Sequence, residues 1–135
     1  MRTLWRPMLL LLLLLIVVPI TAWYWAARHK PRQRWLFTGA GFGVVASPWS
    51  LGLYATYFIP YVGLPSGMVG LFLVLVHGMP GFELAKHFGL IAPTSVVEGA
   101  GHFYVEALNA LFWGPLYGAI GWILDRVHKR SPANV

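Results

Sequence analysis

Residues 95–130 read S-V-V-E-G-A-G-H-F-Y-V-E-A-L-N-A-L-F-W-G-P-L-Y-G-A-I-G-W-I-L-D-R-V-H-K-R. The segment is apolar over most of its length, yet it contains Glu98, His102 and Glu106. Ser95 and Glu98 match a capping box, in which each residue satisfies a backbone amide of the first helical turn. We therefore expect a helix over 96–127. Its basic end suits both a helix C-terminus and a membrane surface.

Polar and aromatic side chains follow one face of this expected helix, at intervals of three or four residues: Glu98, His102, Glu106, Asn109, Trp113 and Tyr117. At 100° per residue they fall within about 100° of arc. Beside them runs a stripe of small residues that includes Gly114, Gly118 and Gly121. Small residues let helices approach closely in lipid, so both stripes are predicted to face protein. Asp125, directly before Arg126, is interpreted as a solvated helix end.

Composition points to lipid as the solvent. The chain has 135 residues, of which 58% are hydrophobic and only 10% are charged, whereas soluble domains carry about 25% charged residues. The net charge is +6, with basic residues gathered at the ends of apolar segments, where they contact anionic headgroups. We predict one membrane domain over 1–135, located in a bacterial cytoplasmic membrane, with the lipid bilayer as partner and no nucleic acid.

Four apolar segments predict an all-α, four-helix polytopic fold. The expected helices cover 4–27, 35–58, 62–79 and 96–127, with an interfacial segment over 80–93. The first is interpreted as a retained helix and not as a cleaved signal peptide, since no small-residue cleavage site follows it. The third is short, because residues 66–79 would reach about 21 Å against roughly 30 Å of hydrocarbon. The alternative is three spanning helices with this segment re-entrant or half-spanning.

Charge and hydropathy favour different numbers of crossings. Four crossings would place five basic residues on each side of the membrane, and three would place seven against three. The positive-inside rule therefore favours three crossings. Re-entrant backbone needs cover from protein or water, which a chain of this size hardly provides. We therefore expect four crossings.

The second expected helix also has a small-residue face, formed by Gly39, Gly43 and Ser50. Residues of this kind at helical spacing are typical of close helix packing in membranes. Pro48 lies within the same segment and is expected to bend it.

An interhelical or ion-binding polar site is the functional hypothesis for the last helix, with Glu106, His102, Asn109 and Glu98 as candidates. Glu106 could bind a proton or cation, the three ionisable groups could hold a metal through His102, or the polar groups could bond across helices. His77 and His102 lie at predicted segment ends, which argues against a haem. No catalytic residue and no cofactor are predicted, and the question of a metal stays open.

Three functions follow, in order of preference. The first is association, as a homo-oligomer or as an accessory subunit of a membrane complex. The second is a small oligomeric transporter or channel that uses Glu106. The third is a metal-dependent membrane enzyme, which has little support because the sequence contains no cysteine and no H-E-x-x-H, G-x-S-x-G or P-loop motif.

Overall fold

The computed structural model describes residues 5–58, 63–92 and 100–130. Its elements are α1 (Trp5–His29), the 3-10 turn η1 (Pro31–Gln33), α2 (Arg34–Ala55), the 3-10 turn η2 (Thr56–Phe58), α3 (Gly63–His87) and α4 (Ala100–Arg130). These ranges contain four α-helices and no strand, so the predicted all-α, four-helix fold is confirmed. The predicted capping box at Ser95 and Glu98 lies outside the described residues.

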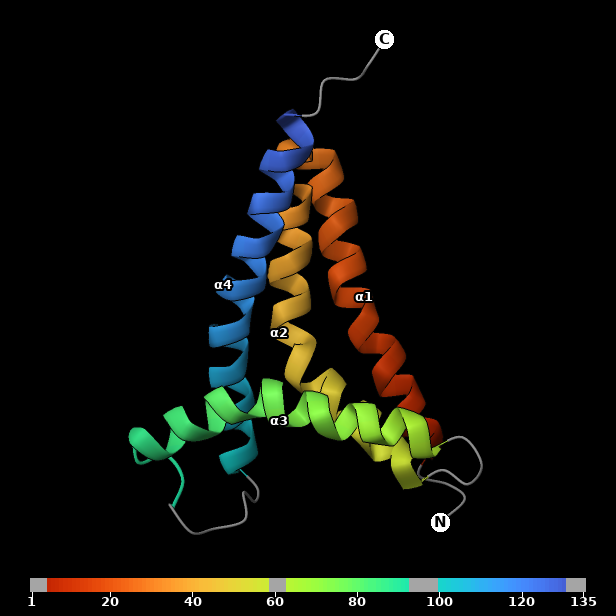
Figure 1. Ribbon diagram of the computed structural model, residues 1–135, viewed down its shortest axis with the longest axis vertical. Helices are drawn as coiled ribbons and strands as arrows, with labels where there is room; N and C mark the ends of the chain where they lie inside the picture. The colour runs from red at the N-terminus through yellow and green to blue at the C-terminus, as the bar shows by residue number, and fades with distance from the viewer. Residues whose placement is uncertain (1–4, 59–62, 93–99, 131–135) are drawn as a thin grey trace.

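The four helices do not form an up-and-down bundle. In Figure 1, α1, α2 and α4 run alongside one another, and α3 lies across them near the end where α2 finishes and α4 starts. The connection between α1 and α2 lies at the opposite end, beside the last turns of α4. The central helix is α2, because it packs against each of the other three.

Three described segments are long and apolar enough to cross a bilayer: Pro31–Ala55, Ser66–His87 and Gly101–His128. Large apolar side chains such as Phe72, Leu111 and Ile123 remain exposed on them. Such exposure would be costly in water and is favourable in lipid. The described helices therefore belong in a membrane.

The third helix differs from the prediction, which ended it at residue 79 and placed a separate interfacial segment over 80–93. In the structure α3 continues through Pro80 to His87. A proline inside a helix removes one backbone donor and leaves the carbonyl four residues earlier without that partner. Side chains of α4 bond two backbone groups on either side of the proline, the Gly81 N–H and the His77 carbonyl, and so hold this part of α3 in place.

Backbone contact joins α2 to α4. A Cβ atom on Gly39 would collide with the Tyr117 carbonyl, and one on Gly43 would collide with the carbonyl of Trp113. The same holds for Gly121 of α4 against the carbonyl of Trp35 in α2. These three glycines permit a separation that no larger residue allows.

Asp125 corrects the prediction of a solvated helix end. Its side chain is buried, with 6% of its surface exposed. Oδ1 accepts from the Trp35 backbone N–H at 3.2 Å and Oδ2 from that of Leu36 at 3.0 Å. These are the second and third residues of α2, whose amides have no partner within the helix. A carboxylate from the end of α4 thus caps the start of α2, and the negative charge suits that end of the helix dipole.

Candidate functional site

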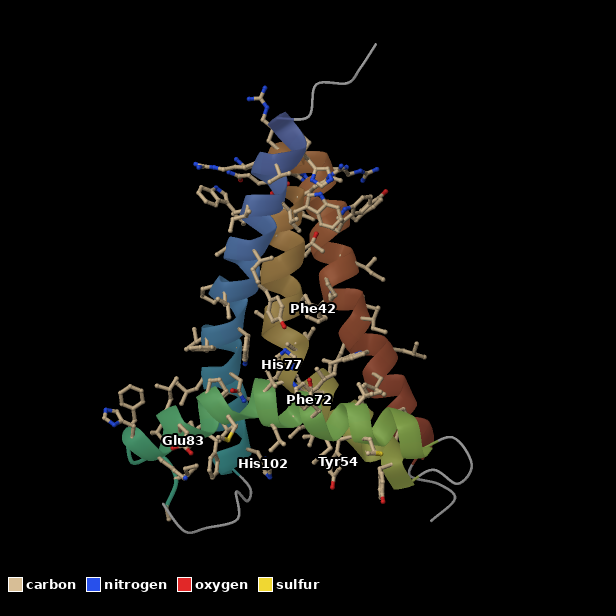
Figure 2. All side chains as sticks on the ribbon, in the orientation of Figure 1. Phe42, Tyr54, Phe72, His77, Glu83 and His102 are labelled. Atoms are coloured by element: carbon tan, nitrogen blue, oxygen red, sulfur yellow. The ribbon has the colours of Figure 1, made fainter. Side chains whose placement is uncertain are left out.

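Polar side chains gather where α3 crosses α2 and α4. We call this set the polar cluster; it comprises Ser47 and Ser50 of α2, His77 of α3, and Glu106, Asn109, Trp113 and Tyr117 of α4. Figure 2 labels His77 on the side of α3 that faces the bundle. Ser50 and Asn109 are the largest fully buried side chains in the described fold.

One chain of hydrogen bonds ends at a carboxylate. The Gly81 backbone N–H donates to Asn109 Oδ1 at 2.6 Å, and Asn109 Nδ2 donates to Ser47 Oγ at 3.1 Å. The Ser47 hydroxyl then donates to Glu106 Oε1 at 3.2 Å. The other carboxylate oxygen, Glu106 Oε2, is buried and has no hydrogen-bond partner. This chain of hydrogen bonds links α2, α3 and α4 and leaves Glu106 Oε2 as an unused acceptor.

A second chain is closed at both ends. The Ser50 hydroxyl donates its single hydrogen to the Ala46 carbonyl at 2.6 Å, so Ser50 Oγ accepts from His77 Nδ1 at 2.9 Å. In the neutral imidazole the other ring nitrogen, Nε2, is then the acceptor for the Tyr117 hydroxyl, at 2.9 Å. Every polar atom of Ser50 and of the His77 ring is satisfied by the fold.

Trp113 connects the second chain to the backbone of α3. Its indole N–H donates to the His77 carbonyl at 2.9 Å, and its ring lies edge-on to the imidazole with centroids 4.9 Å apart. The α4 side chains Asn109 and Trp113 thus hold two backbone groups of α3, one on each side of Pro80. The cluster positions the crossing helix.

The four residues predicted for a polar site are divided by the structure. Glu106 and Asn109 lie in the polar cluster, joined through Ser47. His102 is exposed and lies in the first turn of α4, beyond the crossing with α3 (Figure 2). Glu98 lies outside the described residues. Within 5–58, 63–92 and 100–130, no three His, Asp or Glu side chains come together in a way that could hold a metal ion.

Sequence reasoning missed Ser47 and His77 as site residues. His77 was interpreted as a segment end, whereas it lies inside α3 with 5% of its surface exposed. A histidine within an apolar segment was the available signal, because an ionisable side chain in a membrane span needs polar partners from the protein. Its partners Ser50 and Tyr117 come from other helices, so spacing within one segment could not reveal them.

The Ser50–His77 pair has the distance of a nucleophile and its base, but not the geometry. Nucleophilic catalysis needs a hydroxyl that can reach substrate and pass its proton to the base. Ser50 is 1% exposed, and its hydrogen points to the Ala46 carbonyl and not to His77. The pair holds helices together.

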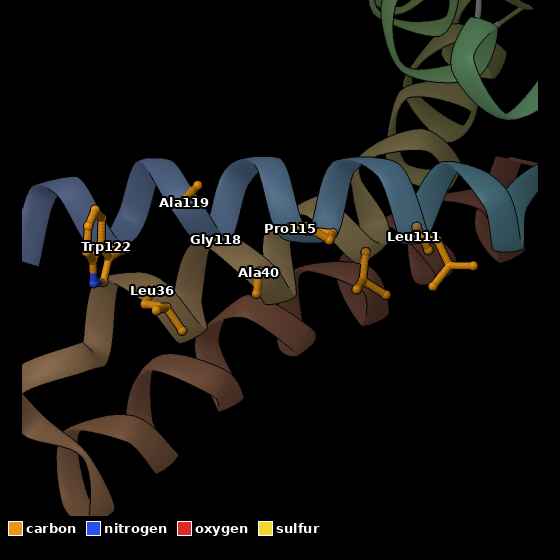
Figure 3. Close-up of a pocket in the computed structure, with 10 residues that line it drawn as sticks. Leu36, Ala40, Leu111, Pro115, Gly118, Ala119 and Trp122 are labelled. Carbon is orange, nitrogen blue, oxygen red and sulfur yellow. The ribbon is translucent and has the colours of Figure 1, made fainter.

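A groove with a volume of about 610 Å³ lies on the outer side of the α2–α4 pair. Figure 3 shows its walls, formed by Leu36, Ala40, Val44, Ala110, Leu111, Gly114, Pro115, Gly118, Ala119 and Trp122. A Cβ atom on Gly114 would meet Val44 Cγ2 at 3.5 Å, and one on Gly118 would meet Ala40 Cβ at 3.4 Å, which are ordinary contacts. Packing between α2 and α4 therefore does not require glycine at these two positions.

Taken together, the fold and its exposed apolar surface define a small all-α membrane protein. The chain matches no protein-family model, and comparisons with curated proteins and with solved structures find no similar chain.

Proposed function

We propose that the protein works by helix–helix association in the membrane, as a homo-oligomer or as an accessory subunit of a membrane complex. One observation carries the proposal. The α2–α4 groove is floored by Gly114 and Gly118, although the internal packing leaves room for a Cβ atom at both. Small residues that the fold itself does not need are suited to the backbone of another helix.

The dimensions and chemistry of the groove fit a helix. On α4 it extends from Ala110 to Trp122, which is about 18 Å of helix at 1.5 Å per residue. Its lining residues are apolar, so association would depend on close van der Waals packing, which drives helix contacts in lipid. The polar cluster, by contrast, is hydrogen-bonded within the chain except at Glu106 Oε2, which is buried.

Filling the groove tests this proposal. Ala119 is exposed and lines the groove, whereas the neighbouring Ile120 is exposed outside it. Ala119→Phe should abolish oligomers or co-purifying subunits in native mass spectrometry after mild detergent extraction, and Ile120→Phe should leave them intact. A wild-type protein that purifies as a stable monomer without a partner, or equal behaviour of the two variants, would contradict the proposal.

For the arrangement in the membrane, we propose that α1, α2 and α4 cross the bilayer and that α3 lies across them within it. Two observations support this. The three helices run side by side while α3 crosses them (Figure 1), and the outward side chains of α3, such as Met68, Phe72 and Met79, are exposed and apolar.

Charge supports an orientation. The end with the α1–α2 connection carries seven basic residues: Arg28, Lys30, Arg32, Arg34, Arg126, Lys129 and Arg130. By the positive-inside rule this end would face the cytoplasm, in a bacterial cytoplasmic membrane. Cysteine labelling of a Gln33→Cys variant in intact cells tests this, because the chain has no native cysteine. Labelling by an impermeant reagent from outside would overturn the orientation.

A second candidate function is proton or cation transfer through Glu106, favoured by its unpartnered oxygen. Glu106 Oε2 is buried without a donor, a costly state for a carboxylate that a bound proton or cation would relieve. Glu106→Gln should abolish flux in reconstituted vesicles, while Glu83→Gln, at an exposed carboxylate, should not. Unchanged flux in the Glu106 variant rules this function out.

A further inference from the structure

The basic end of the bundle holds positive charges that have no carboxylate partner among the described residues. The described basic side chains there are Arg28, Lys30, Arg32, Arg34 and Arg126. The ion pair found among the described residues, Lys86 with Glu83 at 3.3 Å, belongs to the end of α3. Asp125 is the described carboxylate at the basic end, and both of its oxygens accept backbone N–H groups of α2. The arginines therefore lack a carboxylate partner from the described residues.

Arg32 and Arg34 differ from the other two arginines in what surrounds them. Arg28 lies over the ring of Tyr24 at 5.0 Å, and Arg126 lies over that of Trp122 at 3.6 Å. Arg32 and Arg34 instead line a hollow of about 230 Å³, together with Pro31, Trp35, Asp125 and His128. Two arginine residues thus border one hollow.

Aromatic rings form part of the wall of this hollow. Trp35 stacks with His128 at 6.1 Å between ring centroids, and His128 Nδ1 bonds to the Leu124 carbonyl at 3.0 Å. Trp35 is the second residue of α2, where the basic turn gives way to the apolar span. Tryptophan at such a boundary lies at the level of lipid headgroups. We therefore expect the hollow at the level of the bilayer phosphates.

We propose that this hollow binds the phosphate of an anionic phospholipid headgroup, with Arg32 and Arg34 as the charged donors. A guanidinium group matches two phosphate oxygens with parallel hydrogen bonds, and neighbouring arginines are suited to planar, bidentate recognition of this kind. The carboxylate of Asp125 does not oppose the anion strongly, because it is buried against the positive end of α2. The site is separate from the α2–α4 groove and does not depend on the proposed association.

Lipid retention tests the proposal with a control matched in charge. The protein is placed in nanodiscs of equal phosphatidylglycerol and phosphatidylcholine, released into mild detergent, and its bound lipid is counted by native mass spectrometry. The double variant Arg32→Gln/Arg34→Gln is compared with Arg28→Gln/Lys30→Gln, which removes the same charge at the same end outside the hollow. All four side chains are exposed, so both variants should fold, and circular dichroism checks that they do.

Wild type and the control should each retain phosphatidylglycerol in preference to phosphatidylcholine. The Arg32/Arg34 variant should lose that retention by about tenfold or more, as expected for lost charge-assisted hydrogen bonds. An equal loss in both variants, or no lipid preference in wild type, would overturn the site. Soluble glycerol phosphate shares the phosphate chemistry. If it displaces phosphatidylglycerol from the wild-type protein, the ligand is a soluble phosphate and the lipid assignment is wrong.

Discussion

Two regions of α4 use the same residue types for different purposes. In the region where the fold is closed, Gly121 is in backbone contact with Trp35 of α2, and both polar atoms of the Asn109 side chain are hydrogen-bonded. In the region where the groove opens, Gly114 and Gly118 of the same glycine stripe have room for a Cβ atom, and the lining is apolar. The first region is closed by the chain itself, and the second is open.

This difference teaches that a small residue in a membrane helix does not by itself mark an internal contact. Glycines three or four residues apart on one helix can be required by the fold or left free for a partner. The distance from an added Cβ atom to the opposing helix separates the two cases. Substitutions in the closed region and at the groove should then have unequal effects on stability.

Gly43→Ala is expected to have the largest effect. The added Cβ would collide with the Trp113 carbonyl, so α2 and α4 must separate. Overpacking against backbone should lower the free energy of unfolding by about 3 kcal/mol or more. Unfolding in mixed micelles with increasing dodecyl sulfate measures it. Gly121→Ala should behave alike, and wild-type stability in both variants would mean that the helices are not in backbone contact.

Asn109→Leu, also in the closed region, should have the next largest effect on the free energy of unfolding. It leaves the Gly81 N–H without its acceptor and removes a donor from Ser47. The expected loss is about 1–2 kcal/mol, in the range of buried hydrogen bonds between membrane helices. The same unfolding titration reports it, with His102→Ala as an exposed control on the same helix. Equal stability of the two variants would show that the polar cluster does not hold α3.

Asp125→Ala should cost about 1 kcal/mol, the usual effect of removing a helix cap. The Trp35 and Leu36 amides would lose their acceptor at the start of α2. Thermal unfolding followed by circular dichroism in detergent detects the change. Asp125→Asn keeps an acceptor but not the charge, so its loss should be smaller. An alanine variant that unfolds at the same temperature as the wild-type protein would favour the solvated helix end that the sequence predicted.

Gly114→Ala should have the smallest effect on the free energy of unfolding. Its Cβ would lie at ordinary contact distance from Val44. Alanine is favoured over glycine inside a helix by about 1 kcal/mol in water, so stability should be unchanged or slightly raised. The unfolding midpoint is measured beside that of Gly43→Ala. A loss of stability as large as in Gly43→Ala would mean that the groove region is packed as tightly as the closed region.

The prediction succeeded where information was local to one segment. Hydropathy and helical spacing were sufficient for the all-α fold, and they placed Glu106 and Asn109 on one face of the last helix. The prediction failed at Pro80 and at Asp125, because in both cases the hydrogen bonds around the residue run to another helix. His77 escaped notice for the same reason. Its ring is satisfied by Ser50, 27 residues earlier, and by Tyr117, 40 residues later.

By itself, the sequence determined that the chain is helical, that lipid is its solvent, and that basic residues gather at the ends of its segments. These properties follow from composition and periodicity, which act within a few turns of helix. Only the tertiary structure decided which glycines touch another backbone, that α3 lies across the other helices, and that Asp125 caps α2. The reason is physical: a buried polar group or a glycine acquires its role from the atoms opposite it, and in this fold those atoms come from distant parts of the chain.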